Sequence, residues 1–455
     1  MKNLPAALTT VACIMLLILS SAVTSGFSLP LPFDSPDDSG CCVGLVATGK
    51  ICKDQRSILW KNRHFYTMNQ HPFFYKGDKY TFFGVGGTYG QCRMGMNEKG
   101  LSIGNFDVNG PLDHWSYVSD GSSGSEDNDQ KIPLGNFSTV SETAWWLAHH
   151  AYYGAGRQWG IISAEQGVGA VVAIDTQGHS NITWVNNTYA VFANAFYCDG
   201  DHDPDGTDIR AQELFEDLLT KPTSNVKSQG INWRDICQLL ATDTHDKEDG
   251  EGTYSYAGEI SGTSAFSAMV AVSGTPLLHM AWLNIGRTTQ ISIFLPLSAS
   301  YLQSEDDIPK PFRDGNGIQQ YSDVKFTYAS AGSNQYYCDR VREIQHYTFW
   351  NENLTFHMYD LLKNRVSSCT NKAMIRYYIK QYVECAVTVA LQGYVHNSTN
   401  GPLSTTSNAK EPPIMFNVFV PFLPGLSTTY GACSSQSFTK LEKICSPYSV
   451  CSTSG

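Results

Sequence analysis

The sequence predicts an α+β fold in which a strand-rich region comes before a helical one. Short apolar runs bounded by glycine and polar turns recur from residue 43 to residue 295, and such runs are typical of strands. The C-terminal third shows long helical patterns instead, at 336–362 and 372–395. Strands that are mixed with segregated helices indicate an α+β architecture.

The predicted strands are the apolar runs at 43–48, 57–60, 101–106, 159–163, 168–174, 189–193, 267–272, 277–283 and 290–295. Helical periodicity predicts further helices at 140–152, 208–219 and 233–241. Thr139 and Glu142 have the spacing of a capping box, which marks the start of the first of these helices. Two polar segments, 119–130 and 401–413, are predicted to be a surface loop and a linker before a cysteine-containing tail.

Residues 1–26 have the three parts of a secretory signal: a positive start, an apolar run and a small-residue end. We therefore expect the mature protein to be secreted or to lie in the lysosomal or endosomal lumen. The apolar run is shorter than the roughly 20 residues that span a bilayer, so we expect no membrane-spanning segment. Glycosylation triplets agree with this route, at Asn136, Asn181, Asn186, Asn353 and Asn397.

Charge and cysteine content narrow the class of protein further. The formal net charge is -11 and there is no Lys/Arg cluster, which argues against nucleic acid as a partner. The 13 cysteines are spread along the chain rather than grouped as metal-binding pairs, and an oxidising compartment should join several of them in disulfides. The glycines at 84–87 lack the helix that follows a phosphate-binding loop. We expect neither a metal nor another cofactor.

Cys41 and Cys42 follow a leader with three prolines and an acidic pair, which is too broken to form a helix or strand. Residues 27–41 are predicted to be a pro-segment that is cut away. A free α-amino group, with a pKa of about 8, can act as base for the thiol of the same residue. An N-terminal cysteine would thus be nucleophile and base together. Taken alone, the doublet is better explained by disulfides in a secreted protein.

Three downstream blocks change this interpretation: SILWKNRHF at 57–65, GMNEKGLSI at 95–103 and YAVFAN at 189–194. Together with the cysteine, and in this order, they resemble the N-terminal-nucleophile hydrolases of the penicillin V acylase, bile salt hydrolase and acyl-coenzyme A:6-aminopenicillanic acid acyltransferase group. The second block is nearly letter for letter that family's M-N-E-K-G-L turn. Residues 267–299 resemble its last core strands, so the resemblance covers about residues 41–300.

The resemblance implies a four-layer αββα sandwich, placed at residues 42–330, with residues 331–455 as a helical C-terminal extension. It also implies that the chain cuts itself before a cysteine and then hydrolyses a linear amide. The substrate would be a small-molecule amide or a short peptide. The sequence leaves the oligomeric state, the disulfide connectivity and the particular substrate open.

The family pattern assigns roles to four positions. Cys42 is the nucleophile if the alignment has no gap, whereas Cys41 would need one inserted residue. Asn194 matches the asparagine whose amide helps to hold the oxyanion. Lys61 falls at the family's arginine beside the nucleophile, and His64 at the carboxylate that orients the N-terminal amine. A histidine accepts protons near neutrality and can still polarise a thiol.

Three features stay open. The second oxyanion donor is either Asn105 or Asp107, while Asn97 and Gly100 are more typical of a turn. An arginine that the family often places in the fourth block is replaced by ISGT at 260–263. With His64 in place of the carboxylate, a catalytically degenerate binding protein is the first alternative. An acyltransferase that uses the same site is the second.

Overall fold

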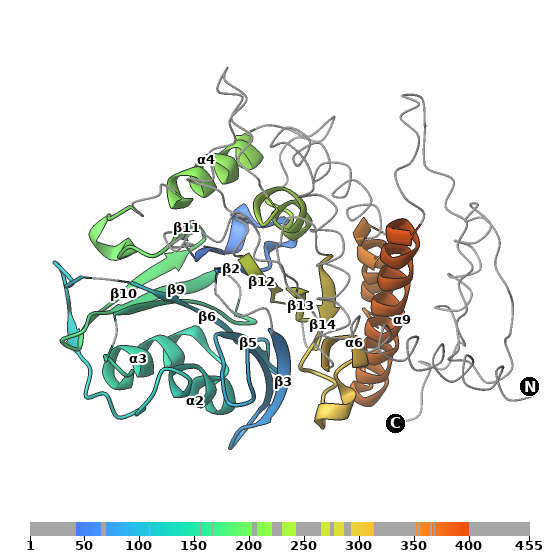
Figure 1. Cartoon of the computed structure of the whole chain (residues 1–455), viewed down its shortest axis with the longest axis horizontal. Coiled ribbons are helices and arrows are strands. Elements are labelled where there is room, and N and C mark those ends of the chain that lie inside the picture. Colours follow the sequence, from blue (N-terminus) through green and yellow to red (C-terminus); the bar gives the residue numbers. More distant parts are fainter. Residues whose placement is uncertain are drawn as a thin grey trace, which may run out of the picture. The chain divides into compact units, whose positions relative to one another are not determined.

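The computed structural model describes residues 42–64, 70–202, 207–220, 230–242, 265–313 and 352–399, apart from 109, 155, 166, 274–276, 286–292, 354, 365 and 368. Two antiparallel sheets are stacked between helices, which confirms the α+β class and agrees with an αββα sandwich (Figure 1). The leader, most of 336–362 and the linker at 401–413 lie outside the described residues, so the predictions for them stay untested.

The first sheet has six strands in the order β11-β1-β2-β12-β13-β14. Its strands are β1 (Val43–Ala47), β2 (Ile58–His64), β11 (Tyr189–Phe192), β12 (Ala265–Val272), β13 (Met280–Ile285) and β14 (Leu295–Leu297). Every neighbouring pair is antiparallel. Each of the six strands overlaps a predicted apolar run. However, β2 continues four residues beyond the run predicted at 57–60, and β14 begins only at the last residue of the run predicted at 290–295.

The second sheet has eight strands in the order β3-β4-β5-β6-β8-β9-β10-β7. Its strands are β3 (His71–Lys76), β4 (Thr81–Gly86), β5 (Met94–Asn97), β6 (Ser102–Asp107), β7 (Tyr117–Val118), β8 (Arg157–Ile162), β9 (Val168–Ile174) and β10 (His179–Asn186). Only β6, β8 and β9 were predicted. The other five are flanked or interrupted by proline, glycine and polar residues that hide their alternation.

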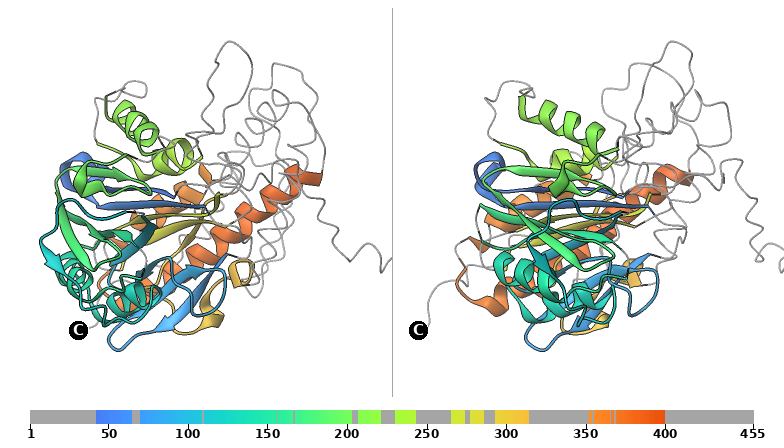
Figure 2. Two further views of the ribbon diagram at one scale, coloured as in Figure 1. Left: turned by 60° about the vertical axis from the view of Figure 1, so that its left-hand side comes forward. Right: turned by 90° about the vertical axis from the view of Figure 1, so that its left-hand side faces the viewer.

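Helices cover both outer faces of the sandwich (Figures 1 and 2). On the eight-stranded sheet lie α2 (Asn128–Asn136) and α3 (Val140–His150), and on the six-stranded sheet α4 (Thr207–Thr220) and the turn of α5 (Trp233–Asp235) and η4 (Ile236–Leu240). The helix α9 (Lys372–Thr399) runs beside β14. Thr139 accepts a hydrogen bond from the Glu142 amide at 3.2 Å, so the predicted start of α3 is confirmed.

The helix α2 is a correction to the sequence prediction, which gave a surface loop over 119–130. The loop ends at Asp127 and a helix begins at Asn128. Pro133 and Gly135 lie inside this helix and weaken its pattern in the sequence. Gly135 is required there because a Cβ would come within 2.9 Å of the Gly77 backbone.

Glycines allow the two sheets to approach one another. A Cβ on Gly160 or Gly169 of the eight-stranded sheet would lie 2.6–3.1 Å from the Val46 side chain of β1. A Cβ on Gly44 would lie 2.4 Å from the Phe106 ring of β6. Gly44 and Val46 therefore face the other sheet, and the alternation of β1 places Cys42 on the same inner face.

The outer face of the six-stranded sheet is closed by aromatic packing. Trp282 of β13 is fully buried and stacks on Trp233 of α5 at a centroid distance of 3.6 Å. Tyr359 meets the Trp282 ring edge-on at 5.1 Å and donates a hydrogen bond to the Leu278 carbonyl. Residues from three distant parts of the chain thus fix the sheet that carries Cys42.

Gly44→Ala should lower the free energy of unfolding by about 1–3 kcal/mol, because the new methyl group overlaps both the Phe106 ring and the Trp60 carbonyl oxygen. Denaturant unfolding would measure this. Gly104→Ala is the matched control, since its Cβ would come only within 3.3 Å of the flexible Lys61 side chain. Equal losses in the two variants would contradict the close approach of the sheets at Gly44.

Candidate active site

Cys42 lies directly before β1 and is buried. The register between β1 and β2, continued by one residue past its last pair, places Cys42 beside Arg63. The register between β1 and β11, continued by two residues, places it beside Asn194. The fold therefore brings the predicted nucleophile and the predicted oxyanion donor to neighbouring strand ends, whereas Cys41 lies outside the described residues.

Lys61 is 1% exposed and reaches from β2 across to the eight-stranded sheet. Its ammonium donates hydrogen bonds to the Asn105 carbonyl, to Asn105 Oδ1 at 2.9 Å and to the Arg93 carbonyl at 3.5 Å. It also lies 4.7 Å from the centre of the Phe106 ring. Burial lowers the pKa of Lys61 to about 8, although the negative charge that Cys42 can carry favours the ammonium form. Lys61 is thus a buried cation close to the thiol.

Arg63 is a second buried cation beside Cys42, and the sequence analysis did not assign it a role. It is 4% exposed and its guanidinium donates to the Gln70 side chain. Burial lowers the pKa of Arg63 to about 10, and the charge on Cys42 acts in the opposite direction. Alternation along β2 could have revealed this residue, because positions 61 and 63 share one face of a strand.

Asn194 follows β11 and is half-buried. Its amide nitrogen donates to the Asp107 carbonyl at 2.5 Å, so its side chain is tied to the end of β6. Asn105 and Asp107 lie on this same strand end, and their chemistry separates the two candidates for the second donor. Asn105 Oδ1 accepts from Lys61, which orients its amide. The Asp107 carboxylate accepts from Arg157 at 3.2 Å, and an ionised carboxylate cannot donate. Of the two side chains only that of Asn105 offers an N–H, but Asn105 alternates with the inward-facing Gly104 and Phe106, so its side chain starts on the outer face of β6, away from Cys42.

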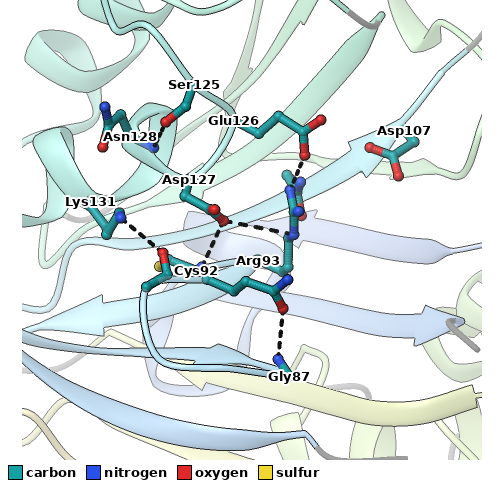
Figure 3. Close-up of polar contacts among 12 residues, drawn as sticks. Gly87, Cys92, Arg93, Asp107, Ser125, Glu126, Asp127, Asn128 and Lys131 are labelled. Atoms are coloured by element: carbon teal, nitrogen blue, oxygen red, sulfur yellow. Dashed lines mark hydrogen bonds and ion pairs between the residues drawn. The ribbon is translucent and has the colours of Figure 1, made fainter. Parts of the chain in front are cut away.

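A network of ion pairs lies over this end of the eight-stranded sheet, and no part of it was predicted. The Glu126 carboxylate bridges Arg93 and Arg157, with one oxygen 2.5 Å from the Arg157 guanidinium. Figure 3 shows Arg93 held between Glu126 and Asp127. Burial would raise the pKa of Glu126, but hydrogen bonds from Arg157 and Arg93 hold it below its usual value. The loop before α2 thus contributes a fixed carboxylate.

The remaining motif residues have structural surroundings. His64 is the last residue of β2 and pairs with Ala265, and its side chain is outside the described residues. Asn97 donates to two carbonyls of the α2 segment and accepts from two amides of its own turn, and Gly100 has a φ of +83°. These two residues build the M-N-E-K-G-L turn, as the sequence indicated.

Cysteines other than Cys42 are buried or half-buried in the described part of the chain. Cys52, Cys92, Cys198 and Cys237 are free thiols there. Burial raises the pKa of Cys52 to about 12 and has the same effect on Cys92 and Cys198. At Cys52 and Cys92 the effect of burial outweighs that of the nearby cations, which are Arg56 at Cys52 and Lys131, Arg93 and Lys61 at Cys92. Within the described residues there is also no group of His, Cys, Asp and Glu arranged for a metal ion.

No protein-family model and no curated protein matches the sequence. Among solved structures the chain is similar to a Caenorhabditis elegans orthologue of N-acylethanolamine-hydrolyzing acid amidase, at 12% identity and a TM-score of 0.36, covering 52% of this chain and 94% of that one. It is similar to a mutant of conjugated bile acid hydrolase from Clostridium perfringens, at 15% identity and a TM-score of 0.39, covering 58% and 93%.

A third similar structure is penicillin V acylase from Agrobacterium tumefaciens, at 15% identity and a TM-score of 0.32, covering 58% of this chain and 89% of that one. Identities of this size concern the fold alone.

No helix of the described residues is long and apolar enough to cross a membrane.

Lys61→Met should slow alkylation of Cys42 by iodoacetamide about tenfold at pH 7, because a nearby cation favours the reactive thiolate. The difference should shrink above pH 8, where Lys61 itself loses its proton. Peptide mass spectrometry of the labelled protein measures both. Lys99→Met, at a turn beside Tyr80, is the control and should react like the unchanged protein. A variant that labels as fast as the control at pH 7 would contradict this role.

Proposed function

We propose that this protein is a self-processing cysteine hydrolase that cleaves linear amides. The observation that carries the proposal is the position of Cys42, at a strand start between Asn194 and Arg63 and close to the buried ammonium of Lys61. A thiol beside cations and an amide donor is the arrangement that acyl transfer to sulfur requires.

Maturation would begin with the attack of Cys42 Sγ on the carbonyl carbon of residue 41. The peptide C–N bond breaks, the acyl group passes to sulfur, and the thiol proton passes to the nitrogen that becomes the new α-amine. Water then hydrolyses the thioester. The products are a carboxylate at residue 41 and a free amine and thiol at Cys42.

Turnover would use the same groups. The Cys42 amine takes the thiol proton while sulfur attacks the amide carbon of the substrate, and the oxyanion accepts a hydrogen bond from the Asn194 amide. The amine then gives the proton to the leaving nitrogen as the C–N bond breaks. Water hydrolyses the acyl-thioester and releases the carboxylic acid. Lys61 and Arg63 stabilise the negative charge that develops on the sulfur as the thiol proton leaves.

We further propose that the protein works in the secretory or endolysosomal lumen. Two of its glycosylation triplets begin at exposed residues, Asn186 at the end of β10 and Asn353. Surface exposure is what glycan attachment requires. Digestion with an endoglycosidase of protein secreted from cultured cells would test this, and an unchanged mass would contradict it.

Cys42→Ala should leave the pro-segment attached and abolish amide hydrolysis, because the same sulfur performs both steps. Mass spectrometry of the N-terminus and a panel of N-acyl amide substrates measure the two effects. Cys198→Ala, which removes a half-buried thiol elsewhere, is the control and should mature and turn over normally. The Cys41→Ala variant should also lose its pro-segment and hydrolyse amides normally.

Three outcomes would contradict this assignment of the site. Fully active protein with an intact junction between Cys41 and Cys42 would exclude the self-processing mechanism. Mature protein that is alkylated at Cys42 but hydrolyses no amide would indicate a binding protein of the same fold. Product analysis with added amine acceptors separates an acyltransferase from a hydrolase.

Asn194→Ala should lower kcat about 10²–10³-fold and change KM little, because a lost oxyanion donor acts on the transition state. Steady-state kinetics on the mature protein measure this. Gln212→Ala, which removes an exposed side-chain amide on α4, is the control. An Asn194→Ala variant with the kcat of the control would remove Asn194 from the mechanism.

A further inference from the structure

Gln158 makes three hydrogen bonds to the segment that carries Asn194. It lies on β8 and is fully buried. Its Nε2 donates to the carbonyls of Ala193 and Ala195, both at 2.7 Å, and its Oε1 accepts from the Tyr197 amide at 3.2 Å. Both N–H groups and the oxygen of the Gln158 side-chain amide therefore form hydrogen bonds to the backbone of one short segment, residues 193–197.

The position of these bonds matters because β11 ends at Phe192. Beyond it the ladder with β1 stops, and the backbone groups on either side of Asn194 need other partners. The two carbonyls that Gln158 binds belong to the residues directly before and after Asn194. The side chain of Gln158 thus replaces the missing ladder on both sides of the predicted oxyanion donor.

Gln158 also connects the two sheets at this point. It extends from the inner face of β8, where its neighbour Gly160 contacts the Phe192 ring of β11. Asn194 is tied to the same sheet a second time, through its own amide and the Asp107 carbonyl. The place of Asn194 relative to Cys42 is therefore set by the eight-stranded sheet, although Cys42 itself belongs to the six-stranded one.

We propose that Gln158 is a positioning residue for the reaction: it holds the Asn194 amide where the oxyanion forms. This rests on the proposed function. A side chain must offer two donors and one acceptor at this spot, and only an amide of this length does so. An ionised glutamate would place oxygen against two carbonyl oxygens, and methionine would leave three buried backbone groups without their partner.

The test is a double-mutant cycle of Gln158→Met and Asn194→Ala, measured as kcat and KM on mature protein. Gln158→Met alone should lower kcat about 10–100-fold with KM changed less than about threefold, because a shift of about 1 Å in a reacting group costs up to about 100-fold. In the Asn194→Ala background the same substitution should have almost no further effect on kcat. If Gln158 had only a structural role, Gln158→Met would lower kcat by the same factor with and without the Asn194→Ala substitution.

Gln130→Met is the matched control. Gln130 is equally buried, on α2, and its side-chain amide has no hydrogen-bond partner among the described residues. The Gln130→Met variant should therefore have the kcat of the unchanged protein. If Gln158→Met does not fold, Gln158→Asn, which keeps an amide but withdraws it by one methylene, is measured in the same cycle.

The possible failures are distinguishable. Equal losses in the two backgrounds, or an unchanged kcat in Gln158→Met, would overturn the positioning role while leaving the proposed function intact. Full activity of Asn194→Ala would overturn the mechanism on which the proposal rests, and the positioning role with it.

Discussion

The burial of the Lys61 ammonium between the two sheets is the constraint on which the site depends. A buried cation is costly unless hydrogen bonds and opposite charge replace the lost water. Here the Asn105 side chain, two carbonyls and the Phe106 ring surround it. These contacts fix β2 relative to β5 and β6. Cys42 lies beside β2 at the same end of the sheets.

The ion-pair network extends this constraint outward. Arg93 presents its carbonyl to Lys61 and its guanidinium to Glu126, so one residue links the buried lysine to the loop before α2. Arg157 joins the same carboxylate to Asp107, whose carbonyl holds Asn194. Because the Arg157 side chain is only 3% exposed, removing Glu126 would take from this buried cation its shorter ion pair. The network thus couples the covering loop to both sides of the site.

Much of the fold could be predicted from the sequence, and the failures have physical reasons. The apolar runs of β1, β9 and β12 follow directly from burial on both faces. The prediction for β2 stopped at Trp60 because Lys61 and Arg63 look like the end of a strand. They are inward-facing residues of a continuing strand, kept there by partners on the other sheet. Charged residues at a functional site thus break the pattern on which strand prediction relies.

The candidate site was only half visible in the sequence. Asn194 and Lys61 belong to ordered motifs, so a family resemblance could point to them. Gln158 belongs to none, and its importance depends on the distance between β8 and a segment 35 residues later. Glu126 lies in a polar stretch that indicated only a loop. Side chains that act through another residue leave no spacing pattern, and only the folded arrangement shows them.

His64 stands where the hydrolases that the motifs resemble have a carboxylate, and this difference bears on whether the proposed site can work. A carboxylate that orients an N-terminal amine does not by itself favour a thiolate, since its negative charge opposes one. The cations beside Cys42 do favour it, and both Lys61 and Arg63 are buried, where water screens their charge least. The α-amino group can accept the thiol proton without a carboxylate partner. In the proposed mechanism, activation of the sulfur would therefore depend on the two cations of β2 and on the cut before Cys42, and the residue at position 64 would affect how the amine is held.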